Sequence, residues 1–263
     1  MLVFLLYLVL GAVAGVLAGL FGIGGGMVIV PALIFAFGAQ HVPTEVLTHL
    51  AIGTSLACII TTSISSIYTH NQKGGVLWSI FASCTLGILI GAMLGVQTAV
   101  MLPGPLLQKF IGVFAILVAI QMAFNLKPKA GRELPGKPGM VAAGGVIGWA
   151  SAIFGIGGGT LTVPFLTWCN VRMQQAVGTS AALGLPIAIS GALTNIVEGW
   201  NVEGLPEWSL GYVYLPAVLG IMIASTPFAR VGAKLAHRLP AHVLKRAFAV
   251  LLVIVGVRFL VSG

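Results

Sequence analysis

The sequence predicts an all-α integral membrane protein built from two homologous halves that are inverted relative to each other. Composition is the first reason: 58% of the 263 residues are hydrophobic and only 7% are charged, whereas soluble domains carry about 25% charged residues. A long apolar pattern with a glycine-rich interruption occurs once in each half of the chain. Basic and acidic residues also fall in different loops, as expected when loops lie on different sides of a membrane.

The two halves carry the same motifs in the same order. Residues 20–33 read LFGIGGGMVIVPAL, and residues 153–166 read IFGIGGGTLTVPFL. The pattern A-x-G-T-S follows each copy, at 51–55 and again at 176–180. This ordered recurrence predicts that one transmembrane unit has been duplicated.

The repeats are expected to cover residues 1–126 and 139–263. Between them lies the segment 127–138, which reads KPKAGRELPGKP and is rich in basic residues and proline. Proline and glycine at this density favour an exposed connection over a helix. We therefore expect a basic cytoplasmic linker here.

Each half contains one long interrupted apolar segment followed by three ordinary ones, eight in total. A membrane-crossing helix needs roughly 20 apolar residues, and each segment is about long enough. The segments are residues 2–37, 47–68, 76–100 and 105–125 in the first half, and 140–168, 174–197, 209–229 and 241–261 in the second.

The two GIGGG stretches predict a break inside each interrupted segment. Each glycine costs about 1 kcal/mol relative to alanine inside a helix. Irregular backbone at membrane depth persists only inside protein or beside a wet cavity. A short helix starting after the glycines would present free N–H groups, which favour an anion. The alternative interpretation is a plain helix break that allows close packing.

Loop charges predict that each interrupted segment enters and leaves the membrane on the same side. If all eight segments crossed, the basic linker and the basic loop 230–246 would lie on opposite sides, against the usual cytoplasmic excess of Lys and Arg. Two re-entrant hairpins and six crossings place both on the cytoplasmic side. The acidic loop 198–208 and both termini then lie outside. Eight full crossings are the alternative.

The paired Gly-Thr-Ser motifs are the second candidate for substrate contact. Thr54 and Ser55 in the first half correspond to Thr179 and Ser180 in the second. Hydroxyl groups can bind an oxyanion without a fixed charge. The alternative is that they bond to carbonyl groups of their own helix.

Several other functions are disfavoured by the sequence. The net charge of +8 is attributed to cytoplasmic loops, and no basic patch with interleaved aromatics suggests nucleic acid. A dinucleotide fingerprint would need glycine where Met27 and Thr160 stand. An enzyme would need a nucleophile–base or carboxylate pair, and a metal site would need clustered acidic or Cys/His ligands. We expect none of these, no cofactor, and no cleaved signal peptide.

The doubled GIGGG…VP stretches, each followed by A-x-G-T-S, resemble the sulfite exporter TauE/SafE family along nearly the whole chain. The resemblance implies a carrier that exports sulfite or an organosulfonate across the bacterial plasma membrane, with the small anion and the lipid bilayer as its partners. An anion channel, or a carrier of another small organic anion, is the alternative. The expected substrate-binding residues are Gly22, Gly24, Gly25, Gly26, Thr54, Ser55, Gly155, Gly157, Gly158, Gly159, Thr179 and Ser180.

Overall fold

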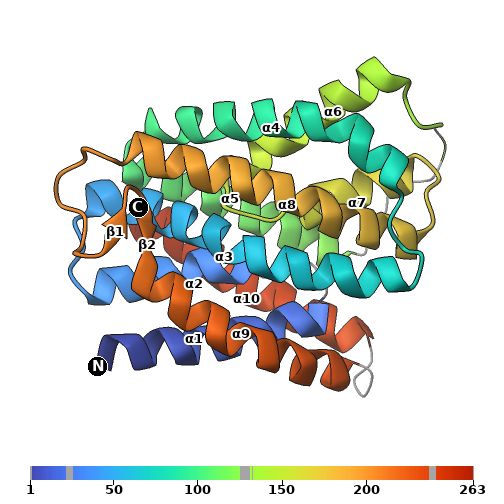
Figure 1. Cartoon of the computed structure of the whole chain (residues 1–263). Coiled ribbons are helices and arrows are strands. Elements are labelled where there is room, and N and C mark those ends of the chain that lie inside the picture. Colours follow the sequence, from blue (N-terminus) through green and yellow to red (C-terminus); the bar gives the residue numbers. More distant parts are fainter. Residues whose placement is uncertain (1, 22–25, 125–130, 132, 237–240, 263) are drawn as a thin grey trace.

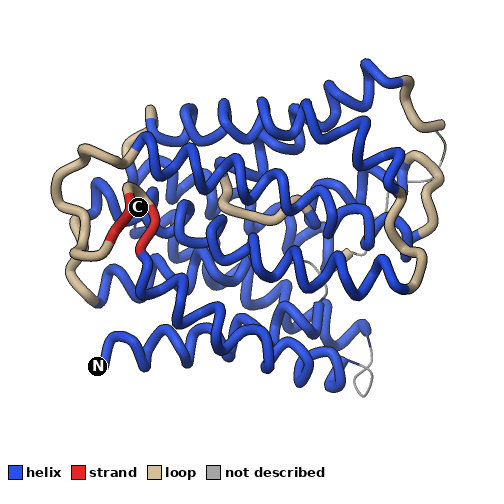
Figure 2. Tube along the Cα trace, in the orientation of Figure 1, coloured by secondary structure: helices blue, strands red, loops and turns tan. Residues whose placement is uncertain are grey.

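The structure is a computed structural model that describes residues 2–21, 26–124, 131, 133–236 and 241–262 (Figures 1 and 2). The helices of the first half are α1 (Leu2–Phe21), α2 (Gly26–Ala39), α3 (Thr44–Gln72), α4 (Trp78–Val100) and α5 (Gly104–Ala123). The second half contains α6 (Lys137–Ile153), α7 (Gly159–Trp168), α8 (Met173–Glu198), β1 (Ser209–Leu210), β2 (Val213–Tyr214), α9 (Leu215–Ala236) and α10 (Ala241–Ser262).

The fold is a helical membrane bundle, as predicted from the composition. Among the described residues, α3, α4, α5 and α8 are the helices long and apolar enough to cross a membrane. The apolar stretches of α8 and α3 are 67% and 56% buried, against 33% for α5. Helices α3 and α8 therefore form the centre of the bundle.

Both interrupted segments are divided into two helices. The first becomes α1 and α2, and the second becomes α6 and α7. Residues 154–158 form the second break, and this loop lies midway along the molecule while the other loops gather at its ends (Figure 2). Residues 22–25 of the first motif lie outside the described part of the chain.

A short strand pair replaces the start of the expected apolar segment 209–229. Strands β1 and β2 are antiparallel, with Ser209 opposite Tyr214 and Leu210 opposite Val213. Gly211 makes the turn between them with a φ of +53°, a conformation that glycine adopts readily. Helix α9 therefore begins only at Leu215. The expectation that a single helical segment starts at residue 209 was wrong.

The loops gather at two opposite ends of the bundle (Figure 1). One end, here called the Pro43 end, holds both chain termini and the loops 40–43, 101–103 and 199–214. The other, called the Gly75 end, holds the loops 73–77, 133–136 and 169–172.

Glycine rows bring helices of different halves into close contact. Helix α1 packs along α9, and α6 packs along α4. A Cβ atom at Gly11 of α1 would lie 2.7 Å from Ile221 Cα of α9, and one at Gly148 of α6 would lie 2.6 Å from the Ile88 carbonyl oxygen of α4. Small residues permit this approach, which adds packing contacts that lipid cannot supply.

Candidate functional site

The second glycine-rich stretch makes a compact turn between α6 and α7. Gly155 and Gly158 both have a φ of +64°. The Ile156 N–H donates to the Ser151 carbonyl at 2.9 Å and closes the end of α6. Gly158 is the N-cap of α7, and its carbonyl accepts the Thr162 N–H at 2.7 Å. The backbone of the turn therefore requires glycine at positions 155 and 158, whereas Gly157 and Gly159 do not have a positive φ.

The start of α7 presents unsatisfied N–H groups, as expected for a helix N-terminus. The Gly159 N–H bonds to the Gly157 carbonyl at 2.6 Å. The N–H groups of Gly157, Gly158 and Thr160 have no hydrogen-bond acceptor in the described part of the chain. Together with the helix dipole, they give this point a partial positive charge.

The start of α2 meets the second glycine-rich turn in the interior. Gly26, the last glycine of the first motif, lies against the second turn: a Cβ atom there would be 2.9 Å from the Gly155 carbonyl oxygen and 2.9 Å from Ile156 Cα. The Ser55 hydroxyl donates to that same Gly155 carbonyl at 2.9 Å. The remaining glycines expected at the site, Gly22, Gly24 and Gly25, lie outside the described residues.

The threonines of the Gly-Thr-Ser motifs hold the starts of helices from the opposite half. Thr54 Oγ1 accepts the Tyr214 N–H at 3.0 Å, just before α9. Thr179 Oγ1 accepts the Leu77 N–H at 2.9 Å, just before α4. Each motif therefore makes the same contact with the other half, and we call the two hydrogen bonds the crosswise latches.

The neighbouring serines differ in their partners. Ser55 bonds to the second turn, whereas the Ser180 hydroxyl has no hydrogen-bond partner among the described residues. Thr54, Ser55 and Thr179 are fully buried and Ser180 is 2% exposed. All four hydroxyls are thus enclosed in this conformation.

Other polar side chains of α3 bond to their own helix. The hydroxyls of Thr61, Thr62 and Thr69 donate to carbonyls three or four residues earlier, at 3.0, 3.1 and 3.1 Å. A carbonyl of the same helix thus satisfies each of these hydroxyls.

The family described as "Sulfite exporter TauE/SafE" matches residues 7–259 of the chain. The chain belongs to the TauE/SafE family. A "Probable membrane transporter protein" of Haemophilus influenzae is 39% identical over 254 residues, which cover 96% of each chain.

More distant relatives also match over most of their length. One from Methanocaldococcus jannaschii is 31% identical over 90% of this chain and 88% of the relative. Another from Bacillus subtilis, YdhB, is 29% identical over 94% of this chain and 96% of the relative. Both carry the name of probable membrane transporter proteins, and no solved structure matches significantly. The chain is therefore a multi-pass membrane transporter protein.

In this TauE/SafE protein, sequence reasoning missed Thr162. Its Oγ1 atom is completely buried without a hydrogen-bond partner, one turn into α7. The available signal was the comparison of the two repeats, in which Ile29 of the first half occupies the position of Thr162. A polar residue in one repeat and an apolar residue in the other marks a difference between them.

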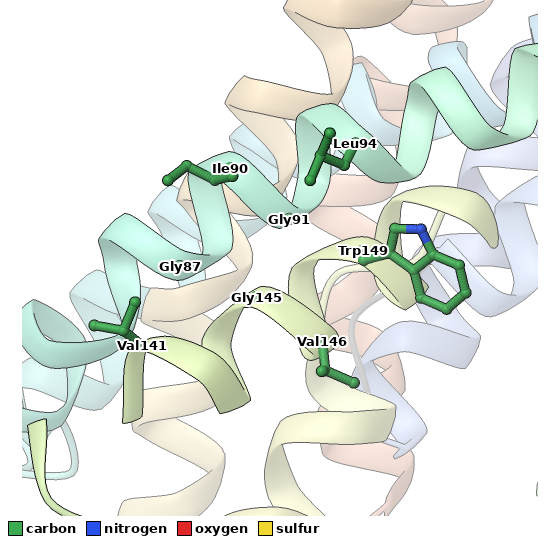
Figure 3. A pocket seen from close by; sticks show the side chains of 8 residues that line it. All are labelled: Gly87, Ile90, Gly91, Leu94, Val141, Gly145, Val146 and Trp149. Atoms are coloured by element: carbon green, nitrogen blue, oxygen red, sulfur yellow. The ribbon is translucent and has the colours of Figure 1, made fainter. Parts of the chain in front are cut away.

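A hollow of about 370 Å³ lies between α4 and α6, and none of the expected site residues lines it (Figure 3). Gly87, Gly91 and Gly145 form its floor, and apolar side chains form its walls (Figure 3). Ile90 and Val146 at its edge are 47% and 66% exposed. Such an open, apolar surface suits lipid chains and offers no group that would hold an anion.

Proposed function

We propose that this TauE/SafE protein exports a small sulfur-containing anion, sulfite or an organosulfonate, across the bacterial plasma membrane. The substrate is bound between two inverted repeats, at the level of the glycine-rich turns. The observation that carries the proposal is the meeting of Gly26 with Gly155 and Ile156 in the interior. Transporters with inverted repeats and broken helices bind their cargo at such a place.

Reciprocal contacts support the inverted arrangement of residues 1–126 and 139–263. Helix α1 of the first half packs on α9 of the second, and α6 of the second packs on α4 of the first. The crosswise latches repeat this exchange at Thr54 and Thr179. An approximate two-fold axis between α3 and α8 accounts for all of these pairs.

Loop charges support a cytoplasmic Gly75 end. Lys73 and Arg172 lie at that end, whereas the loop 199–214 at the Pro43 end carries Glu203 and Glu207. Cytoplasmic loops hold the excess of Lys and Arg. Arg258 runs against the rule, but its guanidinium lies 4.6 Å from the Phe35 ring centroid, where a cation–π contact stabilises it. Six crossings and two re-entrant hairpins fit this arrangement.

The buried site favours a carrier over an open channel. The hydroxyls of Thr54, Ser55, Thr179 and Ser180 are all closed off from solvent. A carrier passes through an enclosed state between openings to either side, whereas a conducting pore needs a continuous wet path. A site at the α7 N-terminus would bind the anion through N–H and hydroxyl dipoles and would not require a buried cation, which is costly in lipid.

Reconstitution into proteoliposomes tests the proposal. The purified protein is assayed with sulfite, methanesulfonate, sulfate and chloride, each with and without an opposing concentration gradient. We expect saturable movement of sulfite or methanesulfonate and accumulation against the gradient when a driving ion gradient is applied. Empty liposomes and a Gly158→Leu variant are the controls.

Two results would count against this function. Transport of none of the four anions by well-folded protein would remove the proposed cargo class. Passive flux that never exceeds equilibrium, under every imposed gradient, would replace the carrier with a channel.

A further inference from the structure

We propose that the anion is bound at the N-terminus of α7 and not at the start of α2, and that Thr162 and Ser63 select a singly charged oxyanion there. The cargo class rests on the proposed transport function, but the site is defined by geometry and can be tested without transport. The corresponding place in the first half, at the start of α2, lacks both hydroxyls.

Thr162 is the first component of this site. Its side chain is completely buried, yet its Oγ1 atom has no hydrogen-bond partner. A Cβ atom added at Gly158 would lie 3.4 Å from Thr162 Oγ1, so the hydroxyl faces the N-cap of α7. A buried hydroxyl without a partner costs about 1–3 kcal/mol. An anion at the free N–H groups of α7 would accept a hydrogen bond from this hydroxyl.

Ser63 approaches the same turn from α3. A Cβ atom at Gly184 of α8 would lie 3.2 Å from Ser63 Oγ and 3.0 Å from the Gly157 carbonyl oxygen. Ser63 is 7% exposed. Both distances are tighter than an ordinary van der Waals contact, so glycine at 184 is what allows the serine hydroxyl to lie this close to the turn. Gly157, Gly159 and Thr160 are only half-buried, which leaves this side of the turn open to a small ligand.

At the symmetry-related place, beside the start of α2, the corresponding positions carry apolar side chains. Alignment of the GIGGG and Gly-Thr-Ser motifs places Ile29 opposite Thr162, Ala188 opposite Ser63, and Ile59 opposite Gly184. All three apolar residues are buried, with exposures of 1%, 0% and 2%. An anion placed there would lose its hydration without gaining hydroxyl donors. The reciprocal packing of the helices is therefore not matched by the side chains near the starts of α2 and α7.

The donors of the site fix the charge of its ligand. Hydroxyl and N–H groups supply partial charges, and none of these residues is ionised. The cost of removing an ion from water grows with the square of its charge, so a dianion costs about four times as much to bury as a monoanion. Hydrogen sulfite and alkyl sulfonates carry one negative charge, whereas sulfate carries two. The site accordingly binds hydrogen sulfite and alkyl sulfonates in preference to sulfate.

Anion-dependent thermal stability of the purified protein tests the site directly, because a ligand that binds the folded state raises the unfolding temperature. The probes are methanesulfonate and sulfate. We expect methanesulfonate to raise the unfolding temperature of the wild-type protein. The apparent Kd for sulfate should be at least about tenfold higher than that for methanesulfonate. Thr162→Val keeps the side-chain shape and should raise the Kd for methanesulfonate about tenfold or more, since a hydrogen bond to a charged group is lost.

Matched variants separate the site from general destabilisation. Ser63→Ala should also weaken methanesulfonate binding, whereas Thr162→Ser should retain it. Ile29→Val, at the corresponding position of the other repeat, should bind as the wild type does. Unchanged Kd values in Thr162→Val and Ser63→Ala, equal weakening by Ile29→Val, or no stabilisation of wild type by methanesulfonate would overturn the inference.

The transport assay gives an independent result. If methanesulfonate binds as described but is not moved across proteoliposomes, the site stands and the transport proposal fails. If anions are transported while Thr162→Val and Ser63→Ala bind and transport normally, the transport proposal stands and this site fails.

Discussion

Gly158 combines a left-handed backbone with a crowded position at the N-cap of α7. Its φ is +64°, and a Cβ atom would lie 2.7 Å from Ile187 Cδ1. A left-handed conformation costs a non-glycine residue about 1–2 kcal/mol before any clash is counted. We expect Gly158→Leu to abolish transport while the protein remains in the membrane, measured by proteoliposome uptake and by the amount of membrane-extracted protein.

Gly145→Ala is the control for this substitution. Gly145 lies in α6, and a Cβ atom there would be 3.7 Å from its nearest neighbour, the Gly87 carbonyl oxygen. This distance is an ordinary van der Waals contact, so the variant should transport normally. Equal transport by Gly158→Leu and Gly145→Ala would reduce the glycine-rich turn to a packing feature.

The serines of the two Gly-Thr-Ser motifs should respond differently to removal of their hydroxyls. Ser55 donates to the Gly155 carbonyl, whereas Ser180 has no partner among the described residues. We expect both Ser55→Ala and Ser180→Ala to weaken apparent substrate affinity several-fold. Only Ser55→Ala should also lower the free energy of unfolding, by about 1 kcal/mol, because it removes a formed hydrogen bond.

Uptake kinetics and thermal unfolding of the two serine variants distinguish these effects. A loss of stability in Ser180→Ala equal to that in Ser55→Ala would indicate that Ser180 has a structural partner. Normal affinity in both variants would remove the serines from the substrate site.

The sequence predicted the glycines of the second turn but not Thr162. The glycines of the second stretch were identified because a run of glycine disfavours a helix, and Gly155 and Gly158 do adopt positive φ. Thr162 was not identified, because a threonine inside an apolar helix has no pattern of its own. Only its burial without a partner, and its contrast with Ile29, distinguish it.

At the scale of elements, the crosswise latches join each central helix to a helix start in the other half. Replacing Thr54 or Thr179 by Val would leave the Tyr214 or Leu77 N–H without its acceptor. We expect Thr54→Val and Thr179→Val to lower stability by similar amounts, about 1 kcal/mol each, as measured by thermal unfolding in detergent.

Serine at the same positions provides the control. Thr54→Ser and Thr179→Ser keep an acceptor oxygen and should retain most of the stability. If the valine variants were as stable as the wild type, these contacts would not help to hold the halves together.

Helices could be predicted where the apolar runs are long. The hydrogen-bond partners of their polar side chains could not be predicted. The expected segment 76–100 became α4 at Trp78–Val100, because an uninterrupted apolar run leaves few other structures in lipid. Strands β1 and β2 were missed because their apolar residues continue into α9. The acceptor role of Thr54 depends on a backbone 160 residues away, which no local pattern specifies.

At the scale of the whole molecule, the arrangement of the loops predicts their accessibility. Lys73 and Glu133 lie at the Gly75 end and Glu203 at the Pro43 end, and all three are exposed. In a chain whose native cysteines are replaced, single cysteines at Lys73 and Glu133 should react with a membrane-impermeant thiol reagent only after the cytoplasmic side is opened. A cysteine at Glu203 should react in intact cells.

Reaction of positions 73 and 133 from opposite faces would rule out the re-entrant hairpins and restore the model of eight full crossings. Reaction of all three positions in the reverse sense would keep the hairpins but invert the orientation, against the distribution of Lys and Arg.

The pairing of α1 with α9 also affects how the protein is made. Helix α1 leaves the ribosome long before α9, and the glycine face that α1 buries packs against α9, which begins only at Leu215. Contacts so distant in sequence form late, because the intervening chain must be synthesised and ordered first. During synthesis the close-packing surface around Gly11 and Gly15 therefore faces lipid or an insertion factor. The packing of α1 is completed only after α9, in the second half of the chain, has been synthesised.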